Sequence, residues 1–169
     1  VVLKKADATG EQSELAVDMV LSAVGLRARV QVAAAAGLQV NRGIVTDRLL
    51  RTSAPDVYAL GDCAEVDGHA LHFVQPLMHA ARALAKTLAG AGTAVTYPAM
   101  PVIVKTPAYP VVVLPPPHAA PGAWRVDVHG NALRAIFTDT HGVMRGFALT
   151  GDATAEKNAL VKQIPGLIE

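Results

Sequence analysis

The sequence predicts an α/β remnant of a larger fold, followed by an α+β domain with an antiparallel sheet. Of the 169 residues, 51% are hydrophobic and 17% are charged, a composition that builds a core and is too apolar for a disordered chain. Nearly unbroken apolar runs near the start are typical of strands covered by helices. Eight of the eleven prolines then lie between residues 98 and 121. This change of composition predicts a boundary near residue 97.

The first elements expected are two strands, at residues 1–5 and 15–24, joined by a polar loop. The second run is almost wholly apolar, so we expect it to be buried on both faces. Residues 30–36 are rich in alanine, and Gly37 suits the end of a brief helix there.

Two more strands and one longer helix are expected before the boundary. Residues 43–46 and 57–60 read as short strands, and the second leads directly into Gly61 and Asp62. Within residues 76–88 apolar side chains recur at helical spacing, and a proline opens the run. We therefore expect a helix over those residues.

Beyond the boundary, short apolar runs punctuated by Pro or Gly predict an antiparallel sheet. The expected strands are residues 102–106, 110–114, 124–128, 133–138 and 143–150. An Asp-Thr-His-Gly turn at residues 139–142 favours a hairpin, and helical spacing returns over residues 155–164.

Charge and cysteine content exclude several classes of partner. The net charge of +1 leaves no global basic field, so we expect neither nucleic acid nor an acidic membrane as a partner. Cys63 is the sole cysteine, which excludes an intramolecular disulfide framework and a multi-cysteine zinc site and favours a cytoplasmic location. The chain opens on Val1 rather than Met, with no signal segment, so we expect a piece of a longer protein.

The most informative segment is residues 52–62, TSAPDVYALGD, which ends in Gly61 and Asp62. A glycine after a strand lets a polyol chain approach the backbone, and the carboxylate that follows can accept hydrogen bonds from its hydroxyls. The alternative is an ordinary Gly-Asp turn after a strand. The agreement over eleven positions favours a binding role.

This segment resembles the second flavin-binding motif of the flavoprotein reductases with two dinucleotide-binding domains: Thr, four residues, two apolar residues, Ala, any residue, Gly, Asp. Within that superfamily the chain resembles the rubredoxin-NAD(+) reductase and flavorubredoxin reductase group along almost its whole length. The segments that carry this resemblance are GDCAEVDG at 61–68, PLM at 76–78, MPVIVKTP at 100–107, LTG at 149–151 and PGL at 165–167.

The resemblance implies a division into three parts and a set of cofactor contacts. Residues 1–29 would end the NAD(P)H-binding domain, residues 30–96 would end the FAD-binding domain, and residues 97–169 would form the C-terminal rubredoxin-binding domain. Asp62, next to Gly61, would hold the ribityl chain of FAD. The backbone near Phe73, Val74 and Gln75 would direct the following helix at the flavin pyrimidine. A helix N-terminus favours negative charge there, although Pro76 alone is equally compatible with an ordinary surface helix.

The same resemblance implies an enzyme that passes electrons from NADH through FAD to rubredoxin or a similar small iron carrier. We expect the isolated chain to lack this activity, because no GxGxxG follows a strand in it. No catalytic side chain and no metal site are expected, since the histidines have no metal-ligand spacing. The alternatives are a non-catalytic docking fragment or part of a ferredoxin-type or nitrite reductase flavoprotein.

Candidate docking residues follow from the acidic character that the resemblance implies for the partner. They are Lys105, Arg82 and Lys86, with Arg125 and Arg134 as further candidates. Complementary charge raises the encounter rate, but scattered surface cations are more often simply solvated. The parent protein is expected to be monomeric.

Overall fold

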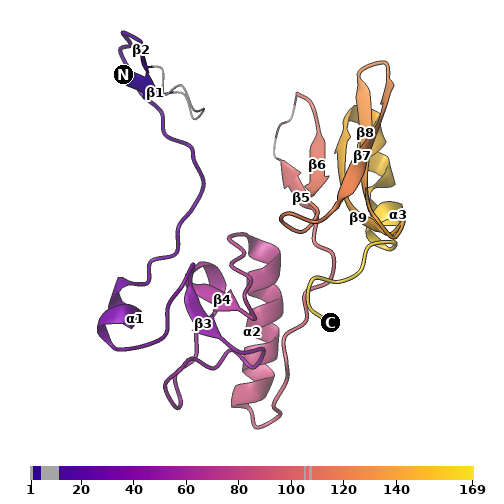
Figure 1. Cartoon of the computed structure of the whole chain (residues 1–169). Helices are drawn as coiled ribbons and strands as arrows, with labels where there is room; N and C mark the ends of the chain where they lie inside the picture. The colour runs from indigo at the N-terminus through magenta and orange to yellow at the C-terminus, as the bar shows by residue number, and fades with distance from the viewer. Residues whose placement is uncertain (1, 5–11, 105, 107) are drawn as a thin grey trace.

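The computed structural model describes residues 2–4, 12–104, 106 and 108–169. Its first elements, β1 (Val2–Lys4) and β2 (Gln12–Glu14), form a two-stranded antiparallel sheet. The chain then continues without regular structure to α1 (Gln31–Ala35), as the indigo segment in Figure 1 shows.

The strand expected at residues 15–24 is absent, and the prediction of burial on both faces is wrong. Met19 is 84% exposed, Leu21 86% and Val24 92%. An apolar strand is buried only when neighbouring strands and helices cover it, and these three side chains remain exposed to solvent. The short helix before Gly37 is confirmed, and that glycine adopts a φ of +79°, which favours a residue without a side chain.

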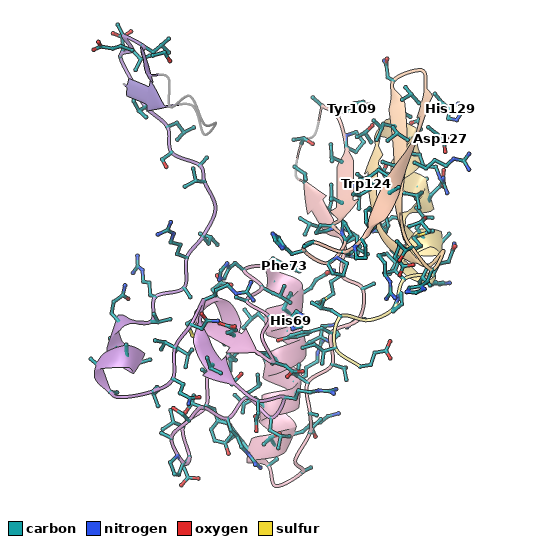
Figure 2. The ribbon with its side chains drawn as sticks, viewed as in Figure 1. His69, Phe73, Tyr109, Trp124, Asp127 and His129 are labelled. Carbon is teal, nitrogen blue, oxygen red and sulfur yellow. The ribbon has the colours of Figure 1, made fainter. Side chains whose placement is uncertain are left out.

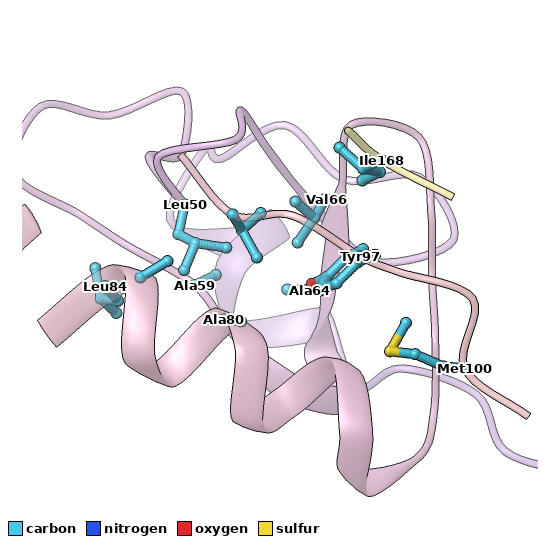
Figure 3. Close-up of a cluster of buried hydrophobic side chains, with 11 residues drawn as sticks. Leu50, Ala59, Ala64, Val66, Ala80, Leu84, Tyr97, Met100 and Ile168 are labelled. Carbon is cyan, nitrogen blue, oxygen red and sulfur yellow. The ribbon is translucent and has the colours of Figure 1, made fainter. Parts of the chain in front are cut away.

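A compact core forms around one helix and a pair of short parallel strands. The strands are β3 (Ile44–Thr46) and β4 (Ala64–Val66), with Val45 opposite Glu65, and the helix is α2 (Val74–Leu88). The predicted helix is confirmed and begins two residues earlier than expected. Figure 3 shows its buried side packed against the cluster. The buried residues of this first core are Leu50, Ala59, Ala64, Val66, Ala80, Ala83, Leu84, Val95, Tyr97, Met100 and Ile168.

The strand expected at residues 57–60 does not form. Only a single bridge joins Arg51 to Tyr58, because the backbone turns out of the extended region at Leu50 (φ 65°) and Asp56 (φ 61°). The strand that pairs with β3 comes after the Gly-Asp pair, at β4, rather than before it.

The second part is a five-stranded antiparallel sheet in the order β5-β6-β9-β8-β7 (Figure 1). This sheet and its helix at the chain's end confirm the predicted α+β architecture. Its strands are β5 (Val102–Val104), β6 (Val111–Leu114), β7 (Gly122–His129), β8 (Ala132–Asp139) and β9 (Met144–Thr150). A 3-10 turn, η2 (Gly151–Glu156), leads into α3 (Lys157–Val161). The second core consists of Val112, Ile136, Phe147, Leu149 and Leu160.

The predicted hairpin joins β8 to β9 and is organised by one carboxylate. Asp139 Oδ1 accepts hydrogen bonds from the backbone N–H groups of His141 and Val143, both at 2.9 Å. Its Oδ2 accepts a hydrogen bond from Arg145 Nε at 2.7 Å. The Arg145 bond and these backbone bonds lower the pKa of Asp139.

The end of the chain returns to the first core. The Tyr97 N–H donates to the Ile168 carbonyl at 2.8 Å, and the Tyr97 carbonyl accepts from the Leu167 N–H at 2.7 Å. The Ile168 side chain is buried among first-core residues. The last residues therefore join the sheet domain to the core around α2. No helix in the described part of the chain is long and apolar enough to cross a membrane.

Candidate functional site

The Gly61-Asp62 pair forms a 3-10 turn, η1 (Gly61–Cys63), between the loop that ends at Leu60 and strand β4. Gly61 has a φ of +82°, and a side-chain carbon on it would meet Leu77 Cδ1 of α2 at 3.2 Å. Only glycine tolerates this conformation freely, so its backbone can lie close to α2. The Asp62 side chain is exposed, and within the described residues it makes neither a hydrogen bond nor an ion pair.

Thr52 at the start of the same motif closes the loop that leads to this turn. Its N–H and its hydroxyl both donate to the Val57 carbonyl, at 2.9 Å each. Its hydroxyl also accepts a hydrogen bond from the Ala54 N–H at 3.3 Å. The threonine therefore fixes the loop locally, as serine and threonine do in turns.

The start of α2 lies next to this turn, and its first N–H groups have no cap. Phe73 is the extended residue before the helix, and no side chain caps it. Pro76 has no N–H, so the unpaired donors are those of Phe73, Val74 and Gln75. The helix dipole adds about half a positive charge at this end. The turn contacts the first turn of α2 through Gly61 and Leu77. Among the described residues no side chain caps the helix start, which follows Phe73 (Figure 2).

A buried carboxylate on β4 that sequence reasoning did not single out holds the segment of residues 41–43, which leads into β3. Glu65 on β4 is 4% exposed and accepts hydrogen bonds from Asn41 Nδ2 at 3.1 Å and the Gly43 N–H at 3.2 Å, with Arg42 Nη2 at 3.9 Å. A side-chain carbon on Gly43 would lie 2.8 Å from the backbone of Ala64 and Glu65. The sequence offered little signal for it, because Glu65 lies in the segment GDCAEVDG between two other carboxylates, Asp62 and Asp67.

The structure distributes the candidate docking cations among different environments. Lys105 lies outside the described residues. Arg82 and Lys86 are exposed on α2, and neither has an ion-pair partner in the described part of the chain. Arg134 instead pairs with Glu156 at 2.8 Å and Asp127 at 3.6 Å.

Arg125 also contacts Asp127, at 3.4 Å, although its own side chain is 80% exposed.

Cys63 donates a weak hydrogen bond to the Leu60 carbonyl, with the sulfur 3.4 Å from the oxygen. Among the described residues no group of three or more His, Cys, Asp or Glu is placed to hold a metal ion.

Two known protein families match this sequence. The pyridine nucleotide-disulphide oxidoreductase family matches residues 3–87, which is half of the chain. The chain belongs to this family. A second match, to the rubredoxin binding C-terminal domain, covers residues 94–164 and so includes the five-stranded sheet and α3.

Curated relatives match most of the chain but extend well beyond it. The rubredoxin-NAD(+) reductase of Alcanivorax borkumensis is 56% identical over 92% of this chain and 41% of that protein. The rubredoxin-NAD(+) reductase of Acinetobacter baylyi is 49% identical over 91% of this chain and 39% of that protein. The nitric oxide reductase FlRd-NAD(+) reductase of Citrobacter koseri is 38% identical over 90% of this chain and 40% of that protein. The chain therefore spans about two fifths of the length of these relatives.

Solved structures share the fold. An NADH:rubredoxin oxidoreductase from Clostridium acetobutylicum has a TM-score of 0.70 at 18% identity, over 84% of this chain and 37% of that chain. A ferredoxin reductase from Rhodopseudomonas palustris has a TM-score of 0.74 at 23% identity, over 97% and 44%. The α/β part and the antiparallel C-terminal sheet thus have the architecture of such reductases.

Proposed function

We propose that this chain is the C-terminal part of an FAD-dependent NADH:rubredoxin oxidoreductase. The observation that carries the proposal is the contact, through Gly61 and Leu77, between the turn that holds the exposed Asp62 carboxylate and a helix start that no side chain among the described residues caps. In the longer protein, FAD would supply hydride and single-electron chemistry. We propose domain limits at residues 1–29, 30–96 and 97–169.

The residues present fit a flavin. Gly61, at a φ of +82°, lets the turn lie close to Leu77 of α2, and the exposed Asp62 can accept hydrogen bonds from the hydroxyls of a ribityl chain. The N–H groups of Phe73, Val74 and Gln75 can donate to an electron-rich ring edge and stabilise negative charge there. His72 directly precedes these residues, and its Nε2 atom is buried without a hydrogen-bond partner among the described residues. A ligand at this end of α2 could supply the missing hydrogen bond.

The partner that fits the C-terminal domain is rubredoxin or a similar small iron carrier, supported by the match over residues 94–164. We propose Arg82 and Lys86, together with Lys105, as cationic contacts for its acidic surface. The longer protein would be a cytoplasmic monomer that takes electrons from NADH. In this arrangement the chain's own residues hold the flavin and orient the partner protein. None of them transfers a proton or forms a covalent bond.

The test measures rubredoxin reduction by NADH with the longer protein and with Asp62→Ala. The proposal predicts that the variant loses flavin and activity together, and that added FAD restores part of the activity. Full activity without Asp62 would contradict the assigned role.

A second candidate is a docking module without activity of its own, favoured by the separate core of the sheet domain. It predicts that this chain binds rubredoxin without flavin and that salt weakens the complex. Absence of salt-sensitive binding would remove this candidate and leave the first one standing.

A further inference from the structure

A cavity of about 150 Å³ lies between one face of α2 and the extended segment that follows the helix. On the helix side it is lined by His79, Arg82 and Lys86, whose spacing of three and four residues puts them on one face. The opposite side contributes Thr93 and Thr96. We call these five residues and the cavity they line the basic groove.

The wall opposite the helix is held rigidly. The Val95 N–H donates to the Arg48 carbonyl at 2.7 Å, and Arg48 Nε donates back to the Val95 carbonyl at 3.3 Å. The Thr93 N–H donates to Thr87 Oγ1 at 3.0 Å. Val95 is 1% exposed, so it anchors this segment in the first core while its neighbours face the groove. A ligand would therefore meet a preformed wall rather than a loop that must be ordered.

Two small residues leave the space open. Ala83 on the helix and Ala94 on the wall both line the cavity, and neither fills it. On the helix side, the His79 ring stands edge-on against the Tyr97 ring, with centroids 6.4 Å apart and planes at 85°. This contact orients a ring that carries at least one N–H donor.

The charged side chains that line the basic groove, Arg82 and Lys86, are both cations. Its lining includes no carboxylate, and neither Arg82 nor Lys86 has an ion-pair partner in the described part of the chain. A guanidinium presents parallel N–H donors that match two oxygens of one oxyanion, and an ammonium adds three more donors. The Thr96 hydroxyl adds one more donor to a cavity of a size suited to a phosphate group, whereas the Thr93 hydroxyl donates to the Ala91 carbonyl at 2.7 Å.

The groove is separate from the turn at Gly61. With a rise of about 1.5 Å per residue, Lys86 lies about 18 Å along α2 from Val74 at the start of the helix. We propose that the basic groove is a binding site for one tetrahedral oxyanion of the phosphate class. The site acts independently of flavin and goes beyond the proposed function. It uses two of the three cations proposed above as docking contacts, so phosphate and the acidic partner would compete for Arg82 and Lys86.

The test is a calorimetric titration of the whole chain with inorganic phosphate, at an ionic strength held constant with sodium chloride. We expect saturable binding of one phosphate per chain. Arg82→Ala and Lys86→Ala should each weaken it about tenfold. Ala94→Leu, which fills the groove without removing a charge, should abolish it. The control is Arg125→Ala, which removes an exposed cation from β7 and should leave binding unchanged. Circular dichroism would verify that each variant is folded.

The titration is repeated with ADP to distinguish a nucleotide phosphate from free phosphate as the ligand. Tighter binding of ADP that is lost in Ala94→Leu assigns the groove to a nucleotide phosphate, and equal binding assigns it to free phosphate. Non-saturable phosphate binding overturns the proposal, as does binding that survives in Ala94→Leu. Occupation by a polyglutamate peptide but not by phosphate also overturns it and leaves Arg82 and Lys86 with the docking role proposed above.

Discussion

At the scale of single residues, Asp62 and Gly43 have opposite roles. Asp62 is exposed and has no partner among the described residues, so its carboxylate contributes nothing visible to the fold. Gly43 is buried where two backbone segments nearly touch. The first should matter for binding and the second for stability, and the two can be separated by mutation.

Asp62→Ala in the longer protein should weaken flavin retention roughly ten- to hundredfold, since a hydrogen bond to a charged group contributes about 1.5–3 kcal/mol. Flavin released on dilution, followed by fluorescence, measures this change. Asp67→Ala, which removes another exposed carboxylate close by in the sequence, is the matched control. Equal retention in both variants would show that Asp62 does not contact the cofactor.

Gly43→Ala should lower the free energy of unfolding by about 1–3 kcal/mol, because the added carbon would overlap the β4 backbone and force it to shift. Gly92→Ala is the control, since nothing lies within 4 Å of a side-chain carbon there. Urea unfolding of both variants provides the comparison. If both variants have the stability of the unmodified chain, then β3 and β4 do not approach as closely as described.

At the scale of elements, the sequence predicted the helices and strands that local residue patterns determine. It did not predict the features that depend on contacts between distant parts of the chain. The α2 helix and the five-stranded sheet follow from periodicity and from Pro and Gly punctuation. The strand expected at 57–60 failed because Leu50 and Asp56 turn the backbone. Asp56 follows Pro55, a pair that favours turns, but nothing in the sequence marks Leu50. Glu65 was missed because its partners, Asn41 and Gly43, lie more than twenty residues earlier in the chain.

The β8–β9 hairpin should make stability depend on pH through Asp139. Its pKa is lower in the folded chain than in the unfolded one. Its contribution is therefore fully present above the pKa that this carboxyl has in the unfolded chain. It is lost as the pH falls through the folded pKa.

Asp139→Asn should flatten the loss of stability on acidification, which thermal unfolding across acidic pH would measure. The Asp152→Asn variant removes an exposed carboxylate from η2 and should retain the acid dependence. An unchanged pH profile in Asp139→Asn would rule out this hairpin as the acid-sensitive element.

At the scale of the whole molecule, two cores are joined by the end of the chain. Ile168 packs into the first core although the sheet domain and α3 precede it in sequence. The strand predicted at residues 15–24 does not form for a reason that also concerns the whole molecule, because an apolar run is buried only where other elements cover it. The apolar pattern was visible in the sequence, whereas the elements able to cover it are not among those described.

Ile168→Ala should lower the free energy of unfolding by about 2–5 kcal/mol, the usual cost of truncating a buried aliphatic side chain. Hydrogen exchange at the Tyr97 amide, which donates to the Ile168 carbonyl, should accelerate. Leu167→Ala is the control, because its side chain is exposed. Unchanged protection at Tyr97 would mean that the chain end does not join the two cores.

The measurement that tests the central claim most directly is visible absorption after incubation with excess FAD and desalting. The chain alone and the longer protein that contains it would be compared side by side. We predict that the longer protein retains flavin and that the chain alone is colourless, because no GxGxxG loop follows a strand in this sequence to bind the pyrophosphate. Stoichiometric flavin on the chain alone, or a colourless longer protein, would contradict this account.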